Sequence, residues 1–193
     1  MVNYAAGSGT SSVVASDVNG DGKIDLAVAA RDSNVVSVLL NQGNGTFAPA
    51  ASYPVGSQPT AVTAADLNGD GKPDLIAAGG DNSPDDTVSV LMNQGNGTFA
   101  TQTTYVVGWV PQSIVATDLN GDGKPDLATA NFRDVNVLFN QGNGTFGAVV
   151  TYSTDANPTA VVTSDLNSDG RTDLLVLSGF DSNVSVMLNT CLP

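Results

Sequence analysis

The chain has 193 residues, 41% of them hydrophobic, and its formal net charge of −13 comes from 19 Asp and no Glu against 6 Lys and Arg. This charge argues against nucleic acid as a partner, because phosphate binding needs clustered Lys and Arg to displace counterions. No apolar run approaches the ~18 residues of a membrane-spanning helix, so we expect no insertion into a membrane.

The start and the end of the sequence give few signals of processing. The opening MVNYAAGSGT lacks the basic start and the apolar stretch of a signal peptide, so we expect any export signal to have been removed or to belong to a longer parent protein. Cys191 is the single cysteine, so an internal disulfide is excluded. It lies near the end of the sequence, where we expect no chemical role.

One motif occurs four times along the chain: DVNGDGKIDL from Asp17, DLNGDGKPDL from Asp66 and again from Asp118, and DLNSDGRTDL from Asp165. The copies are 49, 52 and 47 residues apart, a period that indicates a solenoid, a propeller or another array. A Tyr precedes the first Asp of every copy by thirteen residues, and the four are Tyr4, Tyr53, Tyr105 and Tyr152. The repeat therefore spans the whole sequence.

Each repeat predicts four short strands, which we name a to d. In the second repeat they cover about 60–65, 74–78, 87–93 and 99–106, because these segments are rich in Val, Ala, Thr and Leu and are separated by Gly, Asn, Asp and Pro. Strands a and b are almost continuously apolar, as expected for a sheet covered on both faces. The sequence NQGNGTF between c and d, at 41–47, 93–99 and 140–146, predicts a tight hairpin turn at its Asn-Gly.

These elements predict an all-β fold, a β-propeller of four-stranded antiparallel blades, with four repeats in one domain over 1–193. The last copy ends as NTCLP after strand c, and a segment resembling strand d surrounds Tyr4, so the start of the chain could complete the last blade. This would close a four-bladed ring. The same phase would let two chains exchange their ends, which would give a homodimer with an eight-bladed ring, and both alternatives stay open.

The repeated motif lies between strands a and b, at 17–25, 66–74, 118–126 and 165–173, and gathers hard oxygen donors in a tight loop. Carboxylates at positions 1, 5 and 9, an amide at 3 and a backbone carbonyl at 7 suit Ca²⁺, with Gly at 6 for the sharp turn. An EF-hand is excluded, because its position 12 requires Glu and all four copies have an uncharged residue there. Magnesium needs stricter geometry, and zinc or copper would want His or Cys.

We therefore predict about four Ca²⁺ per chain, with the residue at position 7 binding through its carbonyl while its basic side chain points to solvent. The predicted ligands are Asp17, Asn19, Asp21, Lys23 and Asp25; Asp66, Asn68, Asp70, Lys72 and Asp74; Asp118, Asn120, Asp122, Lys124 and Asp126; and Asp165, Asn167, Asp169, Arg171 and Asp173. A plain polar turn would explain one copy, but four copies in register favour a metal. Bound calcium would reduce the formal charge to −5, so we expect the metals to stabilise the fold and to place the protein in an extracellular or periplasmic setting.

The pattern DxNxDGxxDL, with an apolar strand before it and VSVLLNQGNGTF after it in the first copy, resembles the FG-GAP or VCBS repeat of integrin α-chain-like propellers and many secreted bacterial proteins. The resemblance covers essentially the whole chain. It implies calcium-bound a–b loops in blades of four antiparallel strands, and roles in adhesion or in carbohydrate or protein binding. Propellers of the family usually have six to eight blades, so the resemblance implies a fragment, a small ring or half of an assembled ring.

The loops at the opposite rim, between d and a and between b and c, vary from copy to copy. Trp109, Phe132 and Arg133 are the candidate ligand-binding residues there, because an aromatic surface with polar neighbours suits a sugar or a peptide side chain. Alternatively these side chains only cover a blade edge.

The first functional hypothesis is a non-catalytic, calcium-stabilised module for binding or adhesion. A polysaccharide-degrading enzyme is the second, disfavoured because the chain has neither His nor Glu for acid–base work. The third is a purely structural segment of a larger protein.

Overall fold

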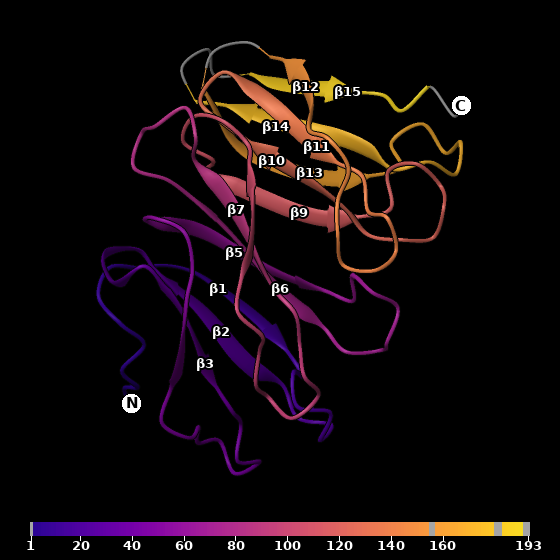
Figure 1. Ribbon diagram of the computed structural model, residues 1–193. Coiled ribbons are helices and arrows are strands. Elements are labelled where there is room, and N and C mark those ends of the chain that lie inside the picture. Colours follow the sequence, from indigo (N-terminus) through magenta and orange to yellow (C-terminus); the bar gives the residue numbers. More distant parts are fainter. Residues whose placement is uncertain (1, 155–156, 180–182, 191–193) are drawn as a thin grey trace.

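The computed structural model describes residues 2–154, 157–179 and 183–190, and fifteen β-strands lie within them (Figure 1). The first sheet contains β1 (Thr10–Ser16), β2 (Asp25–Ala30), β3 (Val35–Leu39) and β4 (Ala51–Pro54). The second contains β5 (Pro59–Ala65), β6 (Asp74–Gly79), β7 (Thr87–Leu91) and β8 (Thr103–Val106). The third contains β9 (Ser113–Thr117), β10 (Asp126–Ala130), β11 (Asp134–Leu138) and β12 (Val150–Ser153). The fourth contains β13 (Pro158–Ser164), β14 (Asp173–Ser178) and β15 (Val184–Met187).

Every sheet is an antiparallel meander in which sequence neighbours pair, so each repeat forms one sheet. The predicted strands a to d of the second repeat are confirmed as β5 to β8, with one difference at the c–d hairpin. There, Asn93 and Phe99 form an isolated bridge, and Ala100 donates to the carbonyl of Met92. The chain then leaves the ladder, so the fourth strand begins only at Thr103.

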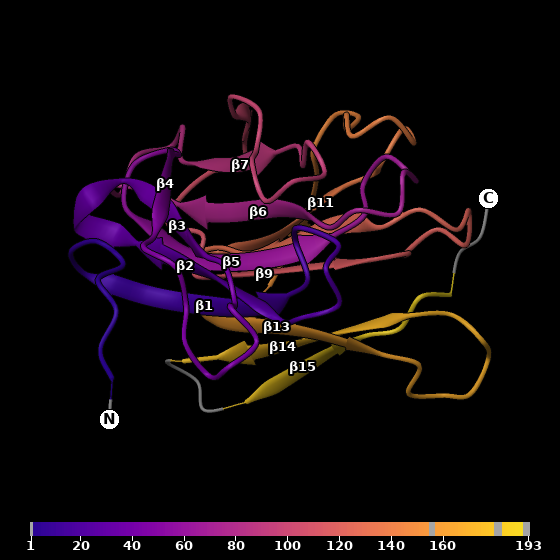
Figure 2. The same ribbon diagram turned by 90° about the horizontal axis from the view of Figure 1, so that it is seen from below.

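The hydrophobic core lies between successive sheets. In β6, Leu75 and Ala77 pack toward the first sheet, whereas Ile76 and Ala78 pack toward the third. This alternation explains why the strand is apolar at every position: both of its faces are covered. The inner strands β1, β5, β9 and β13 pack in this order along the array, and Figure 1 shows the sheets following one another from the N-terminal to the C-terminal end. Figure 2 shows the same array seen from below.

Over the described residues, the array does not close into a ring. The N-terminal segment stays on the first sheet, where Tyr4 packs edge-to-face on Phe47 with 5.5 Å between ring centroids. Backbone bonds from Arg31 to the carbonyl of Gly9 and from Asp32 to that of Ser8 hold this segment there. The predicted closed four-bladed ring is therefore absent from the part of the chain that the structure describes, and the described fourth sheet has three strands.

Two further sequence predictions concern the membrane and Cys191. Over the described ranges, no helix is long and apolar enough to cross a membrane, and the helix found there is the three-residue 3-10 turn η1 (Arg31–Ser33). Cys191 lies outside the described residues.

Candidate metal loops and ligand surface

The a–b loop of each repeat is shaped by its own side-chain oxygens. In the second repeat, Asp66 Oδ1 accepts hydrogen bonds from the N–H groups of Gly69 (2.8 Å) and Asp70 (3.1 Å), and Asp66 Oδ2 accepts one from Gly71 (2.8 Å). The amide oxygen of Asn68 accepts a bond from the same N–H of Asp70. The oxygens at positions 1 and 3 therefore converge on one point of the loop, and Gly71, with φ of 82°, provides the left-handed turn at position 6.

The fourth loop keeps this arrangement with one strained residue. Asp165 accepts bonds from the N–H groups of Asp169 and Gly170, and Asn167 accepts from Asp169. Ser168 replaces Gly at position 4 and takes a left-handed φ of 61°, a conformation that an L-residue with a side chain adopts at a cost.

The side chain at position 7 pairs with the carboxylate at position 5. Lys72 Nζ lies 3.1 Å from Asp70 Oδ2, and this ammonium lowers the pKa of the Asp70 carboxyl, chiefly through their hydrogen bond. The lysine side chain also lies against Gly95 of the c–d turn: a Cβ added to Gly95 would be only 2.7 Å from Lys72 Cε. The basic side chain, 43% of which is exposed, thus lies against two loops at the same rim.

The carboxylate at position 9 is a buried clamp. Asp74 is fully buried; its Oδ2 accepts from the N–H of Leu67 (3.0 Å) and its Oδ1 from the N–H of Asn93 (2.7 Å). Burial raises the pKa of the Asp74 and Asp126 carboxyls, and these backbone donors oppose the rise. Position 9 therefore ties the a–b loop to the c–d turn of its own repeat.

The first Asn of the c–d turn was missed as a functional residue. Asn93 Nδ2 donates to the carbonyl of Val18 in the preceding repeat (2.9 Å) and to that of Pro73 in its own (2.8 Å). Asn140 and Asn189 make the equivalent contacts to Leu67 and Leu119. The sequence did carry a signal, because this Asn persists at 189 although the rest of the turn is lost there.

The loops offer oxygen donors suited to a hard cation, although they are not gathered as a finished metal site. Among the described residues, no three Asp or Cys side chains converge in an arrangement able to hold a metal ion. The side-chain oxygens at positions 1 and 3 accept from the same backbone N–H. The carboxylate at position 5 forms an ion pair with the basic residue at position 7, and the carboxylate at position 9 is buried beneath the loop, where it accepts from two backbone N–H groups. A carboxylate oxygen that accepts one N–H retains a second lone pair, so the set of donors fits calcium chemically.

The structure brings the three predicted ligand-binding residues together. The N–H of Phe132 donates to the carbonyl of Trp109 (2.9 Å), and the Arg133 guanidinium lies 5.5 Å from the Phe132 ring centroid. Trp109 is 50% exposed and Phe132 is 36% exposed. We call these three residues the aromatic surface. They belong to the d–a and b–c loops, whereas the lysine contacts above join the a–b and c–d loops.

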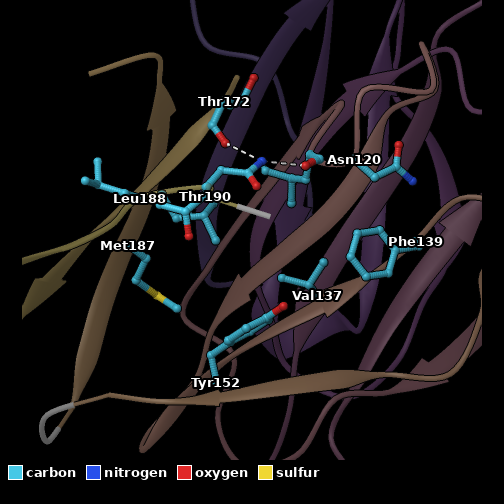
Figure 3. A pocket seen from close by; sticks show the side chains of 11 residues that line it. Asn120, Val137, Phe139, Tyr152, Thr172, Met187, Leu188 and Thr190 are labelled. Atoms are coloured by element: carbon cyan, nitrogen blue, oxygen red, sulfur yellow. Dashed lines mark hydrogen bonds between the residues drawn. The ribbon is translucent and has the colours of Figure 1, made fainter. Parts of the chain in front are cut away.

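A cavity of about 450 Å³ that the sequence did not predict lies between the third and fourth sheets (Figure 3). Tyr152 and Phe139 line it from the third sheet, and Met187 lines it from the fourth. In the two earlier interfaces an aromatic pair fills this position, with Phe99 on Tyr53 and Phe146 on Tyr105 at centroid distances of 5.3 and 5.4 Å. Among the described residues of the fourth repeat, no aromatic ring packs on Tyr152 in this way.

Four-stranded repeats stacked side by side, each with an Asp-rich loop between its first two strands, define a propeller-like repeat protein. Three overlapping stretches, 17–77, 66–129 and 118–176, match the FG-GAP-like repeat, and the chain belongs to this family. The family resemblance found in the sequence is thereby confirmed. No relative among curated proteins matches the sequence.

Several solved structures share the fold. An Agrocybe aegerita lectin, described as specifically recognising non-reducing terminal N-acetylglucosamine, is 24% identical with a TM-score of 0.59, over 91% of this chain and 51% of that one. The V. cholerae biofilm matrix protein Bap1 is 21% identical with a TM-score of 0.60, over 94% of this chain and 27% of that one. The Photorhabdus luminescens Tc holotoxin pore is 20% identical with a TM-score of 0.59, over 93% of this chain and 9% of that one.

The chain therefore spans about half of the lectin and smaller shares of the other two proteins. At these identities the likeness concerns the fold alone.

Proposed function

We propose that this chain is a non-catalytic, calcium-stabilised β-propeller module that binds a carbohydrate at its aromatic surface. The observation that carries the binding role is the pairing of two exposed aromatic rings with a guanidinium on one rim. Trp109 and Phe132 are joined through their backbones, and Arg133 stacks on Phe132. Such rings can stack on the apolar face of a sugar, while the guanidinium donates to its hydroxyl or carboxylate oxygens.

A protein side chain is the alternative ligand for the same surface. The carbohydrate is favoured because both aromatic rings are exposed, which suits stacking on a sugar ring. The lectin with the same fold is described as recognising a terminal sugar, and this supports the choice by analogy of fold only.

Calcium would be held in each a–b loop by the carboxylates at positions 1, 5 and 9, the amide at 3 and the carbonyl at 7, as in Asp66, Asn68, Asp70, Lys72 and Asp74. When bound, it would neutralise the clustered carboxylates and cross-link the loop. With a dissociation constant of about 10⁻⁴ M, a few millimolar calcium adds about 1.8 kcal/mol per site. Free calcium at this level exists outside the cell, so we infer a secreted protein.

Binding is tested on a glycan array, followed by titration of the best glycan. We expect Trp109→Ala and Arg133→Ala to weaken binding at least tenfold without changing the melting temperature. Val106→Ala is the matched control, because Val106 is 52% exposed and lies on β8, outside the aromatic surface. Equal binding by all variants would refute the site, and turnover of a polysaccharide would favour the enzyme hypothesis instead.

Calcium is tested separately by native mass spectrometry and by thermal unfolding with and without a chelator. We expect about four ions per chain and a lower melting temperature in the chelator. An unchanged melting temperature together with no bound metal would refute the calcium proposal. Inertness on the array with calcium bound would leave a purely structural role.

A further inference from the structure

The C-terminal end of the array exposes an apolar face. Six aliphatic side chains of the fourth repeat, on its sheet or directly after a strand, are 45–57% exposed: Val162, Leu166, Leu177, Val184, Val186 and Leu188. Exposed apolar patches of this kind mark interaction sites in soluble proteins. We call these six residues the tail face.

Three earlier sheets show what normally covers this face. Pairing registers make Leu177, Val184 and Val186 equivalent to Ala78, Val88 and Val90 of the second sheet. These three side chains of the second sheet are at most 1% exposed and pack in the core between the second and third sheets. In every interface that the structure describes, the tail face of one sheet is covered by the opposite face of the next sheet.

The N-terminal end of the array presents the complementary face. Val62, Leu75, Ala77 and Phe99 form the side of the second sheet that packs on the first, and their equivalents in the first repeat are Val13, Leu26, Val28 and Phe47. We call these four residues the head face. Val13 is 60% exposed, whereas Val62 is 7% exposed. One chain therefore carries both halves of an interface that it already forms three times internally.

The N-terminal segment supplies a second element of complementarity. Tyr4 packs on Phe47 as Tyr53 packs on Phe99, with centroid distances of 5.5 and 5.3 Å. Tyr53 belongs to the outermost strand of its sheet, so Tyr4 lies where the outermost strand of a preceding sheet would lie. The fourth sheet, over its described residues, has β15 as its outermost strand and lacks this element.

We propose that a second copy of this chain docks head to tail, so that the tail face of one copy packs on the head face of the other. Residues 2–5 of the partner subunit then pair with β15 as the fourth strand. The register follows from Ser89 opposite Thr104 in the second sheet, which places Ser185 opposite Asn3 of the partner subunit. Two copies make this contact twice and close one ring, which deepens the proposed propeller module.

The occupant is a second copy because the required surfaces are present on this chain and are separated within it. The first and fourth sheets stand at opposite ends of the array, with the second and third sheets between them (Figure 1). The contact is heterologous, so each copy uses two different surfaces, which gives the proposal a distinctive test.

The first experiment measures mass by sedimentation of the full chain at micromolar concentration in calcium. We expect a dimer for the unmodified chain, and monomers for Val186→Asp on the tail face and for Val13→Asp on the head face. An equimolar mixture of the two variants should recover a dimer, because one copy keeps an intact tail face and the other an intact head face. Val106→Asp, equally exposed on β8, should remain dimeric.

A monomeric unmodified chain, or a mixture that stays monomeric while both variants are folded by circular dichroism, would overturn the proposal. No glycan is needed, so failure here is distinguishable from failure of the carbohydrate hypothesis.

A second experiment traps the strand pairing. Asn3→Cys and Ser185→Cys are combined in a Cys191→Ser background and oxidised. We expect a disulfide-linked dimer on a non-reducing gel, and no cross-link when Asn3→Cys is paired with Val106→Cys. A cross-linked monomer would show that the chain closes on itself, and the absence of any cross-link would exclude residues 2–5 as the added strand; either result overturns the proposal.

Discussion

Asp74→Asn separates two roles that position 9 of the loop combines. The structure makes Asp74 a buried clamp with one backbone donor on each oxygen, whereas the calcium proposal makes the same carboxylate a ligand. The substitution keeps the volume of the side chain and replaces one acceptor oxygen by an NH₂ group. The N–H of Leu67 or that of Asn93 is then left buried without an acceptor.

The expected magnitude follows from that count of hydrogen bonds. One hydrogen bond to a charged group contributes about 1.5–3 kcal/mol, and a buried unpaired N–H costs about 1–3 kcal/mol, while removal of the buried charge offsets part of this. We therefore expect a loss of about 3 kcal/mol in the free energy of unfolding, or about 6–12 °C in melting temperature for a chain of this size. This loss should persist in a chelator, because it does not involve the metal.

The assay is thermal and urea unfolding followed by circular dichroism, in calcium and in chelator. Asp70→Asn is the matched control: its carboxylate is also a predicted ligand, but its partner Lys72 is exposed, and an exposed ion pair contributes little to stability. The control should lose stability mainly in calcium. If Asp74→Asn matches the unmodified protein in chelator, the clamp contributes no stability and the reasoning fails.

Three further substitutions probe the repeated contacts, each measured by urea unfolding. Phe99→Ala removes a buried ring from the core between the first two sheets and should cost about 3–5 kcal/mol; a cost below 1 kcal/mol would contradict the described packing. Asn140→Ala removes the donor to the carbonyl of Leu67 and should cost about 2 kcal/mol, and an unchanged midpoint would show that this bond between sheets is dispensable. Gly95→Ala places a Cβ against Lys72 at a φ of 89° and should cost at least about 1 kcal/mol, so a neutral result would mean that the lysine moves freely.

The fold was predictable because its signals are local and repeated. Leu75 and Ile76 pack on opposite faces of their sheet, and a continuously apolar sequence is the local signal of such a strand. The sequence NQGNGTF is the local signal of a hairpin, so strand order and pairing could be inferred. Ring closure was not predictable, because it depends on the angle between successive sheets, which no local pattern records. The segment at Tyr4 had the correct phase for strand d but remained on Phe47, held by the backbone bonds at Gly9.

The loops were predicted in composition and only in part in geometry. The pattern indicated oxygen ligands, but it did not show that the carboxylate at position 9 is buried and accepts two backbone N–H groups from different loops, as Asp74 does. That distinction depends on Asn93, nineteen residues away in sequence, and on burial. The same limit applies to the side chain of the lysine at position 7. It lies against Gly95 of the c–d turn, and the motif itself does not record this contact between two loops.

The variation of the d–a loops between repeats raises the question of whether Trp109 is functional or accidental. Its loop is fixed by residues particular to the third sheet: Asn131 and Asn136 both donate to the carbonyl of Val107, and Asn136 stands where the other sheets have Ser. The Oδ1 atoms of both Asn are buried without a partner among the described residues, which costs stability. The two buried amides hold the loop that bears the exposed Trp109, and this support fits the role proposed for the aromatic surface.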